Sequence, residues 1–494
     1  MPQNSSGTMN VDGTCTGLAS PFPPLVQCRS TKFPNPTHLA MVSSSDAPPF
    51  FQVSSFTIPA SHIRSNPRAT STRQDETLHL CYKRYIPLNN LHPQPGDITL
   101  IAGHATGFPK ELYEPLWEEI CRRLDQVTTS GPKPRIRAIW MADCANHGAS
   151  FSLNRPKLGD DPDWMDHSRD LLHFVNTHRS ELPRPLFGIG HSMGANQIVG
   201  LSLLHPRLLE GIVLLDPVMQ DLRVTDEMRE GAEMLGKAMG RKIELFPFRA
   251  SAGRKDRWRS RADAERSILQ NAFYKKWDPR VLQLWLKYGL RNVEPTESSS
   301  AAHNSVSADD TDSLQHQQQA VTLSTPVPQE VQTFVKTHLD PHNLTLKHLI
   351  PHLTSYRSHK SDTQFLHPQP FMSLQSLARL RPRTLFIFGG RSPMSTPSLQ
   401  AEKLSRVGTG LGGNGGIAGN GADSGVVQSV VLERVGHLVA MEDVGGCAGA
   451  VAPWLEEQWQ RYRGEMREYE AWTGRPLGEK QGLSQEWLDA VAKL

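Results

Sequence analysis

A G-x-S-x-G pentapeptide, from Gly190 to Gly194, separates a short apolar run from a segment whose apolar residues recur at helical spacing. A strand, a tight turn and a helix in that order form a nucleophile elbow, which holds its serine at the tip of a sharp turn. The two glycines let the chain bend there without Cβ clashes. The pentapeptide alone is a weak signal, because a glycine-rich turn with a spectator serine carries the same letters. With its flanking strand and helix, it makes Ser192 a candidate nucleophile.

Strand and helix patterns alternate on both sides of this turn. Apolar runs predict buried strands at 98–102 and 211–215, and runs rich in apolar residues predict further strands at 135–141, 384–390 and 426–432. Alternating runs predict antiparallel strands at 50–58 and 78–85. Amphipathic segments between these runs predict helices. The predicted fold class is therefore α/β: a mostly parallel sheet covered by helices on both faces, with an inserted helical cap.

The same patterns divide the chain into segments. In chain order we predict a disordered N-terminal segment (1–48), the first part of the α/β core (49–219), a helical cap with a low-complexity loop (220–380), the second part of the core (381–465) and a C-terminal tail (466–494). The first segment is rich in Ser, Thr, Pro and Asn without periodicity, which is typical of disorder.

Composition excludes several classes of protein. A formal net charge of +3 is too small to indicate a nucleic-acid partner. The 6 cysteines follow neither C-x-x-C nor Cys/His spacing, so we expect a reducing compartment, without a disulfide framework or a zinc site. No apolar run approaches the roughly 20 residues of a membrane span. The N-terminal residues lack a secretion signal, and no metal or redox cofactor is implied.

The chain stops at Ala492, Lys493 and Leu494. This tripeptide is a conservative variant of the S-K-L signal that the peroxisomal import receptor reads. Similar endings also arise by accident, but the missing secretion and membrane signals favour import. We therefore expect this receptor as a partner and the peroxisomal matrix as the location.

A serine nucleophile on an elbow needs an acid and then a histidine later in the chain. His437 follows the last predicted strand, where the base of such a fold normally stands. The acid usually follows the penultimate strand, but that position is Ser392, which cannot stabilise an imidazolium as a carboxylate does. Asp216, at the end of the preceding strand, is the favoured candidate instead; the alternative is that it only caps a turn before a proline. Asp143 is the second candidate.

The oxyanion of a tetrahedral intermediate requires two amide donors. The amide of Met193 opens the predicted helix after the nucleophile, and helix N-termini favour negative charge. The loop after strand 98–102 should supply the second donor, and either Ala105 or Thr106 is placed for it. His104, in the same loop, is expected to buttress the turn rather than to act on substrate.

The predicted cap carries a basic cluster around Trp258. Its members are Arg249, Arg254, Lys255, Arg257, Arg259 and Arg261. Such a run is usually a solvated helix face, but it could also receive phosphates. Arg257 and Arg259 are the residues that we expect to bind substrate.

These motifs together carry a family resemblance. The chain resembles the α/β-hydrolases, and specifically the fungal peroxisomal type linked to toxin and mycophenolic-acid pathways. The segments concerned are 104–113, 146–148, 164–170, 190–194, 216–217 and 492–494. The similarity covers about residues 50 to 460 and the C-terminal tripeptide; the N-terminal segment and the two low-complexity insertions depart from it.

The resemblance implies an acyl-CoA hydrolase. The expected reaction is cleavage of an acyl-CoA thioester, of a polyketide or fatty-acyl secondary metabolite, to the free acid through a Ser-Asp-His acyl-enzyme mechanism. A carboxylesterase or lactonase acting on a secondary metabolite is the first alternative, because relatives with this elbow hydrolyse esters, lactones and amides as well. A non-catalytic binding protein with the hydrolase fold is the second. The sequence leaves open whether the chain forms a homodimer.

Overall fold

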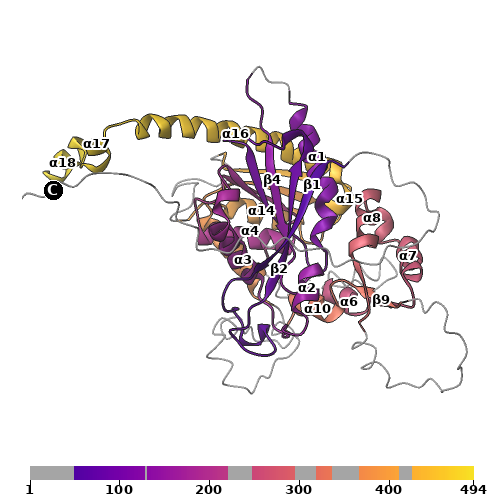
Figure 1. Ribbon diagram of the computed structural model, residues 1–494. Coiled ribbons are helices and arrows are strands. Elements are labelled where there is room, and N and C mark those ends of the chain that lie inside the picture. Colours follow the sequence, from indigo (N-terminus) through magenta and orange to yellow (C-terminus); the bar gives the residue numbers. More distant parts are fainter. Residues whose placement is uncertain are drawn as a thin grey trace, which may run out of the picture.

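The computed structural model describes residues 49–127, 131–220, 247–294, 319–336, 367–410 and 425–493 (Figure 1). The N-terminal segment predicted to be disordered and nearly all of the predicted low-complexity loop lie outside these ranges. The described part is built around a central sheet with helices on both sides, as the alternating patterns predicted.

The central sheet has eight strands in the order β1-β2-β4-β3-β5-β6-β10-β11. Their bounds are β1 Phe51–Pro59, β2 His79–Pro87, β3 Ile98–Gly103, β4 Ile136–Ala142, β5 Leu186–His191, β6 Gly211–Leu215, β10 Arg383–Gly389 and β11 Val427–Leu432. The pairs β1–β2 and β2–β4 are antiparallel, and every other neighbouring pair is parallel. Because β5 lies between β3 and β6, the turn after it opens at the middle of the sheet.

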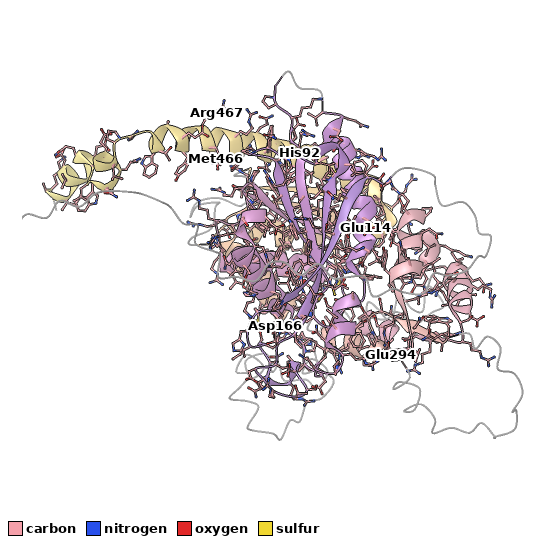
Figure 2. The ribbon with its side chains drawn as sticks, in the orientation of Figure 1. His92, Glu114, Asp166, Glu294, Met466 and Arg467 are labelled. Carbon is pink, nitrogen blue, oxygen red and sulfur yellow. The ribbon has the colours of Figure 1, made fainter. Side chains whose placement is uncertain are left out.

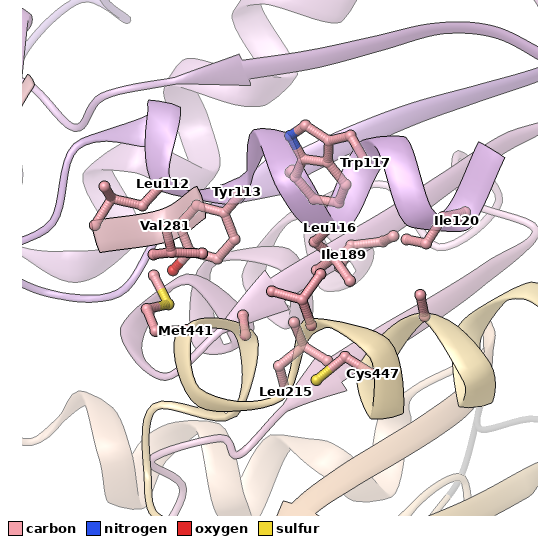
Figure 3. Close-up of a cluster of buried hydrophobic side chains, with 14 of the residues drawn as sticks. Leu112, Tyr113, Leu116, Trp117, Ile120, Ile189, Leu215, Val281, Met441 and Cys447 are labelled. Carbon is pink, nitrogen blue, oxygen red and sulfur yellow. The ribbon is translucent and has the colours of Figure 1, made fainter. Parts of the chain in front are cut away.

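Each face of the sheet packs on its own set of helices. Helices α1 (Glu114–Asp125) and α16 (Val444–Thr473) cover one face, where Ile189 and Leu215 meet Leu116 and Cys447 (Figure 3). Helices α3 (Trp164–Thr177) and α4 (Met193–Leu204) cover the other. In β6, Val213 and Leu215 belong to the first cluster and Ile212 and Leu214 to the second, which explains the continuous apolar run of a strand buried on both faces.

Shorter elements complete the core. They are the helices α2 (Gly148–Asn154), α14 (Pro397–Arg406) and α15 (Val439–Glu442), and the 3₁₀ turns η1 (Pro67–Ala69), η2 (Leu88–Asn90), η3 (Lys110–Tyr113), η4 (Arg179–Glu181) and η7 (Leu377–Arg379). Among the residues that the structure describes, no helix combines the length and apolarity needed to cross a membrane.

The segment between β6 and β10 contains helices, as predicted, and also a small sheet that the sequence did not predict. Its helices are α6 (Pro247–Ala252), α7 (Arg261–Gln270), α8 (Pro279–Tyr288), α10 (Val327–Phe334) and α13 (Gln369–Ser376), with the 3₁₀ turn η5 (Tyr274–Lys276). A second, three-stranded sheet joins them, in the order β7 (Arg257–Trp258), β9 (Val321–Leu323) and β8 (Leu290–Asn292). Strands of two or three residues are too short to show a period in the sequence.

The last long helix also differs from the prediction. Helix α16 continues to Thr473, past residue 466, where the C-terminal tail was predicted to begin. Beyond Tyr462 the side chains are largely exposed, so the apolar stripe ends while the helix does not. This stretch, which includes Met466 and Arg467, projects from the body and is followed by α17 (Leu477–Gln481) and α18 (Gln485–Val491) (Figures 1 and 2).

Candidate active site

The turn after β5 holds Ser192 in a strained conformation. Its φ of 56° lies in the left-handed region, which a residue other than glycine rarely adopts. The reason for the flanking glycines is close approach of backbone segments. A Cβ on Gly194 would lie 2.3 Å from the carbonyl oxygen of Gly103 in β3, and one on Gly190 would lie 2.4 Å from the carbonyl oxygen of Gly194. The first turn of α4 therefore rests directly on the neighbouring strand.

Three side chains from distant parts of the chain meet at this turn. The Oγ of Ser192 lies 2.8 Å from Nε2 of His437, and Nδ1 of His437 lies 2.6 Å from Oδ2 of Asp216. Ser192 follows β5, Asp216 follows β6, and His437 lies in the loop between β11 and α15. The geometry is that of a nucleophile, a base and an orienting carboxylate.

The carboxylate of Asp216 is buried and accepts several hydrogen bonds. The amide of Gly389 donates to Oδ1 over 2.9 Å, and the hydroxyl of Ser395 donates to the same oxygen over 2.6 Å. The hydroxyl of Ser392 donates to Oδ2 beside the His437 ring. Burial alone would raise the pKa of Asp216, but hydrogen bonds from His437, Ser392 and Ser395 outweigh it and hold the pKa below its ordinary value. The group is thus an anion at neutral pH.

The second candidate acid is engaged elsewhere. Asp143 pairs with Nζ of Lys110 over 2.7 Å and accepts from the amides of Lys110 and Ala149, each over 2.9 Å. The contacts with Lys110 tie the segment after β3 to the end of β4, and the contact with Ala149 ties α2 to it; within the described residues, no hydrogen bond joins Asp143 to His437. The hydrogen-bonding geometry therefore favours Asp216.

The two amides that could receive an oxyanion come from adjacent backbone segments. Met193 is the first residue of α4, so its N–H has no partner within the helix. Of the two alternatives in the loop after β3, the Ala105 amide donates to the hydroxyl of Tyr113 over 2.9 Å and is already occupied, which corrects its prediction as a donor. The Thr106 amide makes no hydrogen bond within the described residues, and the Thr106 hydroxyl contacts the Met193 sulfur at 3.4 Å.

His104 orients the Thr106 amide. The Cys144 amide donates to Nε2 of His104 over 2.8 Å, so the proton of the neutral ring is on Nδ1, which donates to the Ala105 carbonyl over 2.9 Å. Burial lowers the pKa of His104 and keeps the ring neutral. The Ala105 carbonyl and the Thr106 N–H belong to one planar peptide and point in opposite directions. Fixing the carbonyl therefore fixes the direction of the N–H.

The inserted segment packs against this same loop. Glu330, a buried residue of α10, accepts from the Ser251 hydroxyl over 2.7 Å and pairs with Arg254. Gly107 has a φ of +83°, and a Cβ there would lie 2.8 Å from Cδ of Glu330. A side chain at this position would push the loop and α10 apart.

The basic cluster of the cap divides into structural and surface residues. Arg254 is committed to Glu330, and Arg261 donates to the Leu286 carbonyl over 2.8 Å. Arg257 and Arg259 are exposed, as the phosphate hypothesis requires. Arg259 lines an open hollow of about 480 Å³, which Lys255 and Arg266 also border, together with Asp263, Ser267 and Gln270. The side chain of Arg249 lies outside the described residues.

With the site assembled, comparison with known proteins becomes informative. Residues 100–451 match the alpha/beta hydrolase family. The chain belongs to this family. The type I acyl-CoA thioesterase mpaH of Penicillium roqueforti is 33% identical over 427 residues, covering 85% of this chain and 90% of that protein. The mpaH protein of Penicillium brevicompactum is 33% identical over 460 residues, covering 89% and 95%.

A solved structure gives the same fold. The peroxisomal alpha-beta-hydrolase Lpx1 of Saccharomyces cerevisiae superposes with a TM-score of 0.58 at 16% identity, over 88% of this chain and 99% of that one. At this identity the likeness concerns the fold alone. The α/β class predicted from the alternating patterns and the α/β-hydrolase fold implied by the resemblance are thus confirmed.

Sequence reasoning missed several residues around the site of this α/β-hydrolase. Ser392 was noted only because it is not a carboxylate, and Ser395 was not noted at all, although both bind Asp216. Tyr113 and His191 were also missed as contacts of the site. The one available signal for His191 was its position inside the pentapeptide, directly before the serine.

Proposed function

We propose that this α/β-hydrolase cleaves an acyl-CoA thioester to the free acid. The observation that carries the proposal is the hydrogen-bonded series of Ser192, His437 and Asp216. The substrate class is supported by the two Penicillium relatives, which are named as acyl-CoA thioesterases and are matched over nearly their whole length.

The reaction follows from the contacts of each group. Ser192 attacks the thioester carbonyl carbon while Nε2 of His437 accepts the hydroxyl proton. The amides of Met193 and Thr106 donate to the oxyanion that forms. When the C–S bond breaks, His437 returns the proton to the departing sulfur, leaving an acyl-serine and free coenzyme A. His437 then takes a proton from water, whose oxygen attacks the acyl-serine. The bond to Oγ of Ser192 breaks as His437 returns the proton to that oxygen, and the free acid leaves.

Asp216 acts on the base and not on the substrate. Because its carboxylate accepts a hydrogen bond from the N–H at Nδ1, Nε2 is left free to take the serine proton, and the imidazolium that forms faces a negative charge. The hydroxyls of Ser392 and Ser395 keep that charge in place.

We further propose that Arg257 and Arg259 contact the phosphates of coenzyme A. Coenzyme A carries a 3′-phosphate and a pyrophosphate, and guanidinium groups bind such oxygens in paired hydrogen bonds. The hollow beside Arg259 has cations on its border and is open to solvent, which suits a polar nucleotide. The acyl part, of polyketide or fatty-acyl type as in the related secondary-metabolite hydrolases, would lie toward Ser192.

The proposed location is the peroxisomal matrix. The observation in favour is that Ala492 and Lys493 are exposed at the end of α18, on the projecting C-terminal helices, within reach of a receptor. Leu494 lies outside the described residues.

One assay separates the proposed function from its alternatives. Wild type and Ser192→Ala would be compared on acyl-CoAs of increasing chain length and on p-nitrophenyl esters of the same acyl groups. A higher kcat/KM for the thioesters, with kcat lost by about 10³-fold or more in Ser192→Ala, supports the proposal. Preference for the esters would indicate a carboxylesterase or lactonase. Absence of turnover together with no labelling of Ser192 by a fluorophosphonate would indicate a binding protein.

A further inference from the structure

Two buried residues outside the triad connect both halves of the site. Tyr113 ends the 3₁₀ turn η3, and its hydroxyl lies in the core between α1, α8 and α15 (Figure 3). His191 is the last residue of β5 and is fully buried. The Tyr113 hydroxyl lies 2.9 Å from Nδ1 of His191, and Nε2 of His191 lies 3.0 Å from the main-chain carbonyl oxygen of His437. The Ala105 amide donates to the same Tyr113 hydroxyl.

The chemistry of these groups gives each hydrogen bond one direction. A carbonyl oxygen only accepts, so Nε2 of His191 must carry the proton that it donates to His437. Burial and the nearby His437 ring lower the pKa of His191 to about 3, so the ring is neutral and its Nδ1 is an acceptor. Tyr113 must then donate its proton to Nδ1, and its oxygen accepts from Ala105.

We propose that Tyr113 and His191 are positioning residues for hydrolysis. The bonds from the Ala105 N–H to Tyr113, His191 and the His437 carbonyl form one directed relay. At one end it anchors the residue before the oxyanion donor Thr106, and at the other it anchors the main chain of the base. The relay thereby fixes the position of the Thr106 amide relative to that of His437. This inference rests on the proposed function of the site.

Removing the Tyr113 hydroxyl breaks the relay in the middle. In Tyr113→Phe the Ala105 amide and Nδ1 of His191 lose their partner where no solvent can replace it. The loop that carries Ala105 and Thr106 can then rotate out of its position at a smaller cost in free energy than in wild type. Because misplacement by about 1 Å can cost 10²-fold in rate, we expect kcat to fall about 10- to 100-fold with KM nearly unchanged.

A matched control separates positioning from general stability. Tyr85 is another fully buried tyrosine of the same core cluster, and its hydroxyl donates to Glu114 over 3.0 Å, off the relay. Tyr85→Phe loses one buried hydrogen bond as well, so it should lower the melting temperature while its kcat stays near that of wild type. If Tyr113→Phe behaves in the same way, Tyr113 is merely structural and the proposal is wrong.

Variants at His191 test the other half of the relay. His191→Phe removes both ring nitrogens and should lose kcat to the same extent as Tyr113→Phe. The double variant should be no slower than the slower single, because either change breaks the same series. His191→Gln keeps an amide donor for the His437 carbonyl and an acceptor for Tyr113, and should recover part of the lost kcat. Full additivity in the double variant would overturn the relay.

The rate of Ser192 labelling by a fluorophosphonate gives a readout that does not depend on the substrate. This reaction needs the activated serine and the oxyanion donors, so the relay variants should be labelled more slowly in proportion to their loss of kcat. If wild type cleaves esters in preference to acyl-CoA, the thioesterase proposal fails while the relay is still measured on esters and by labelling. Unchanged labelling rates in Tyr113→Phe and His191→Phe, or no labelling of wild type, would overturn the relay.

Discussion

Ser392 donates its hydroxyl hydrogen to the carboxylate of Asp216. The two residues follow neighbouring parallel strands, β10 and β6, in which Ile387 and Leu215 are paired. The position after the penultimate strand, where an acid is usual in this fold, is thus held by a hydroxyl that donates to the carboxylate of Asp216, at the end of the neighbouring strand β6. Because both strand ends lie at one edge of the sheet, the His437 ring is within reach of either of them.

This arrangement makes Asp216→Asn a direct test of the proposed acid. Asparagine tolerates the positive φ of 40° at this position, so the backbone should be kept. An amide facing Nδ1 favours the wrong histidine tautomer, and we expect kcat to fall by about 10³- to 10⁴-fold. The control Asp143→Asn weakens a buried ion pair with Lys110, so it should lower the melting temperature with little effect on kcat. The reverse pattern in steady-state kinetics would make Asp143 the acid.

Exposed arginines of the cap provide a test of coenzyme A recognition. The double variant Arg257→Ala and Arg259→Ala should raise KM for an acyl-CoA about 3- to 10-fold with kcat little altered, because contacts between exposed charges are screened by solvent. An N-acetylcysteamine thioester of the same acyl group has no phosphates and should be hydrolysed as by wild type. Equal changes in KM for both substrates would show that these arginines only shape the cap.

Location is tested by removing the last three residues. A protein tagged at its N-terminus with a fluorescent group should appear in puncta that coincide with a peroxisomal marker. Without Ala492, Lys493 and Leu494 it should be diffuse in the cytosol, because the receptor reads this tripeptide. The purified truncated enzyme should keep its specific activity, since the last helix α18 is exposed and remote from the core. Diffuse fluorescence of the intact protein would mean that the tripeptide is not a signal.

Buried neutral histidines should make the fold sensitive to acid. Burial lowers the pKa of His167 to about 3, below its ordinary value of 6.5. Between those two values the His167 ring is protonated in the unfolded chain and neutral in the folded chain. The free energy of unfolding therefore falls as the pH falls. The loss is confined to this window. At higher pH the ring is neutral in both states, and below about pH 3 it is protonated in both.

The contribution of His167 can be measured with a matched pair of variants. His167→Leu removes the group that binds the proton. The free energy of unfolding would be measured by denaturant titration at pH 7, 6, 5 and 4. Its decrease with falling pH should be smaller in the variant than in wild type, by up to about 1.4 kcal/mol per pH unit. His92, which lies on the exposed loop between β2 and β3 (Figure 2), is the control, and His92→Leu should keep the wild-type slope. Parallel slopes for all three proteins would contradict the prediction.

The sequence predicted those parts of the site that depend on chain order and on strand ends. Ser192 and Asp216 each follow a strand with an apolar run, His437 follows the last strand in chain order, and parallel strands bring their ends to one edge. The choice between Ala105 and Thr106 could not be made in this way. It depends on which amide meets a tyrosine hydroxyl, and that contact is set by how η3 packs against β5.

The same limit applies to the cap. Residues that are far apart in sequence form its small sheet, and β9 reaches β7 and β8 across segments without a periodic pattern. Glu330 illustrates the point, because in the sequence it is one acid among 50, and only its burial against Gly107 relates it to the site. Tertiary contacts of this kind have no local signature.

The backbone contact between Gly103 and Gly194 has a consequence for how such an enzyme diverges. These glycines lie beside the segments that carry the Thr106 and Met193 amides. The distance between these two proposed oxyanion donors is therefore set by how closely the two main-chain segments approach each other. Exchanges of side chains in the surrounding cap leave that distance untouched. Cap side chains can therefore change during evolution to accept a new acyl group while the geometry of the amide donors stays the same. In return, a methyl group on Gly194 would collide with the main chain of Gly103, and one on Gly103 would fit only if the main chain at Gly194 shifted.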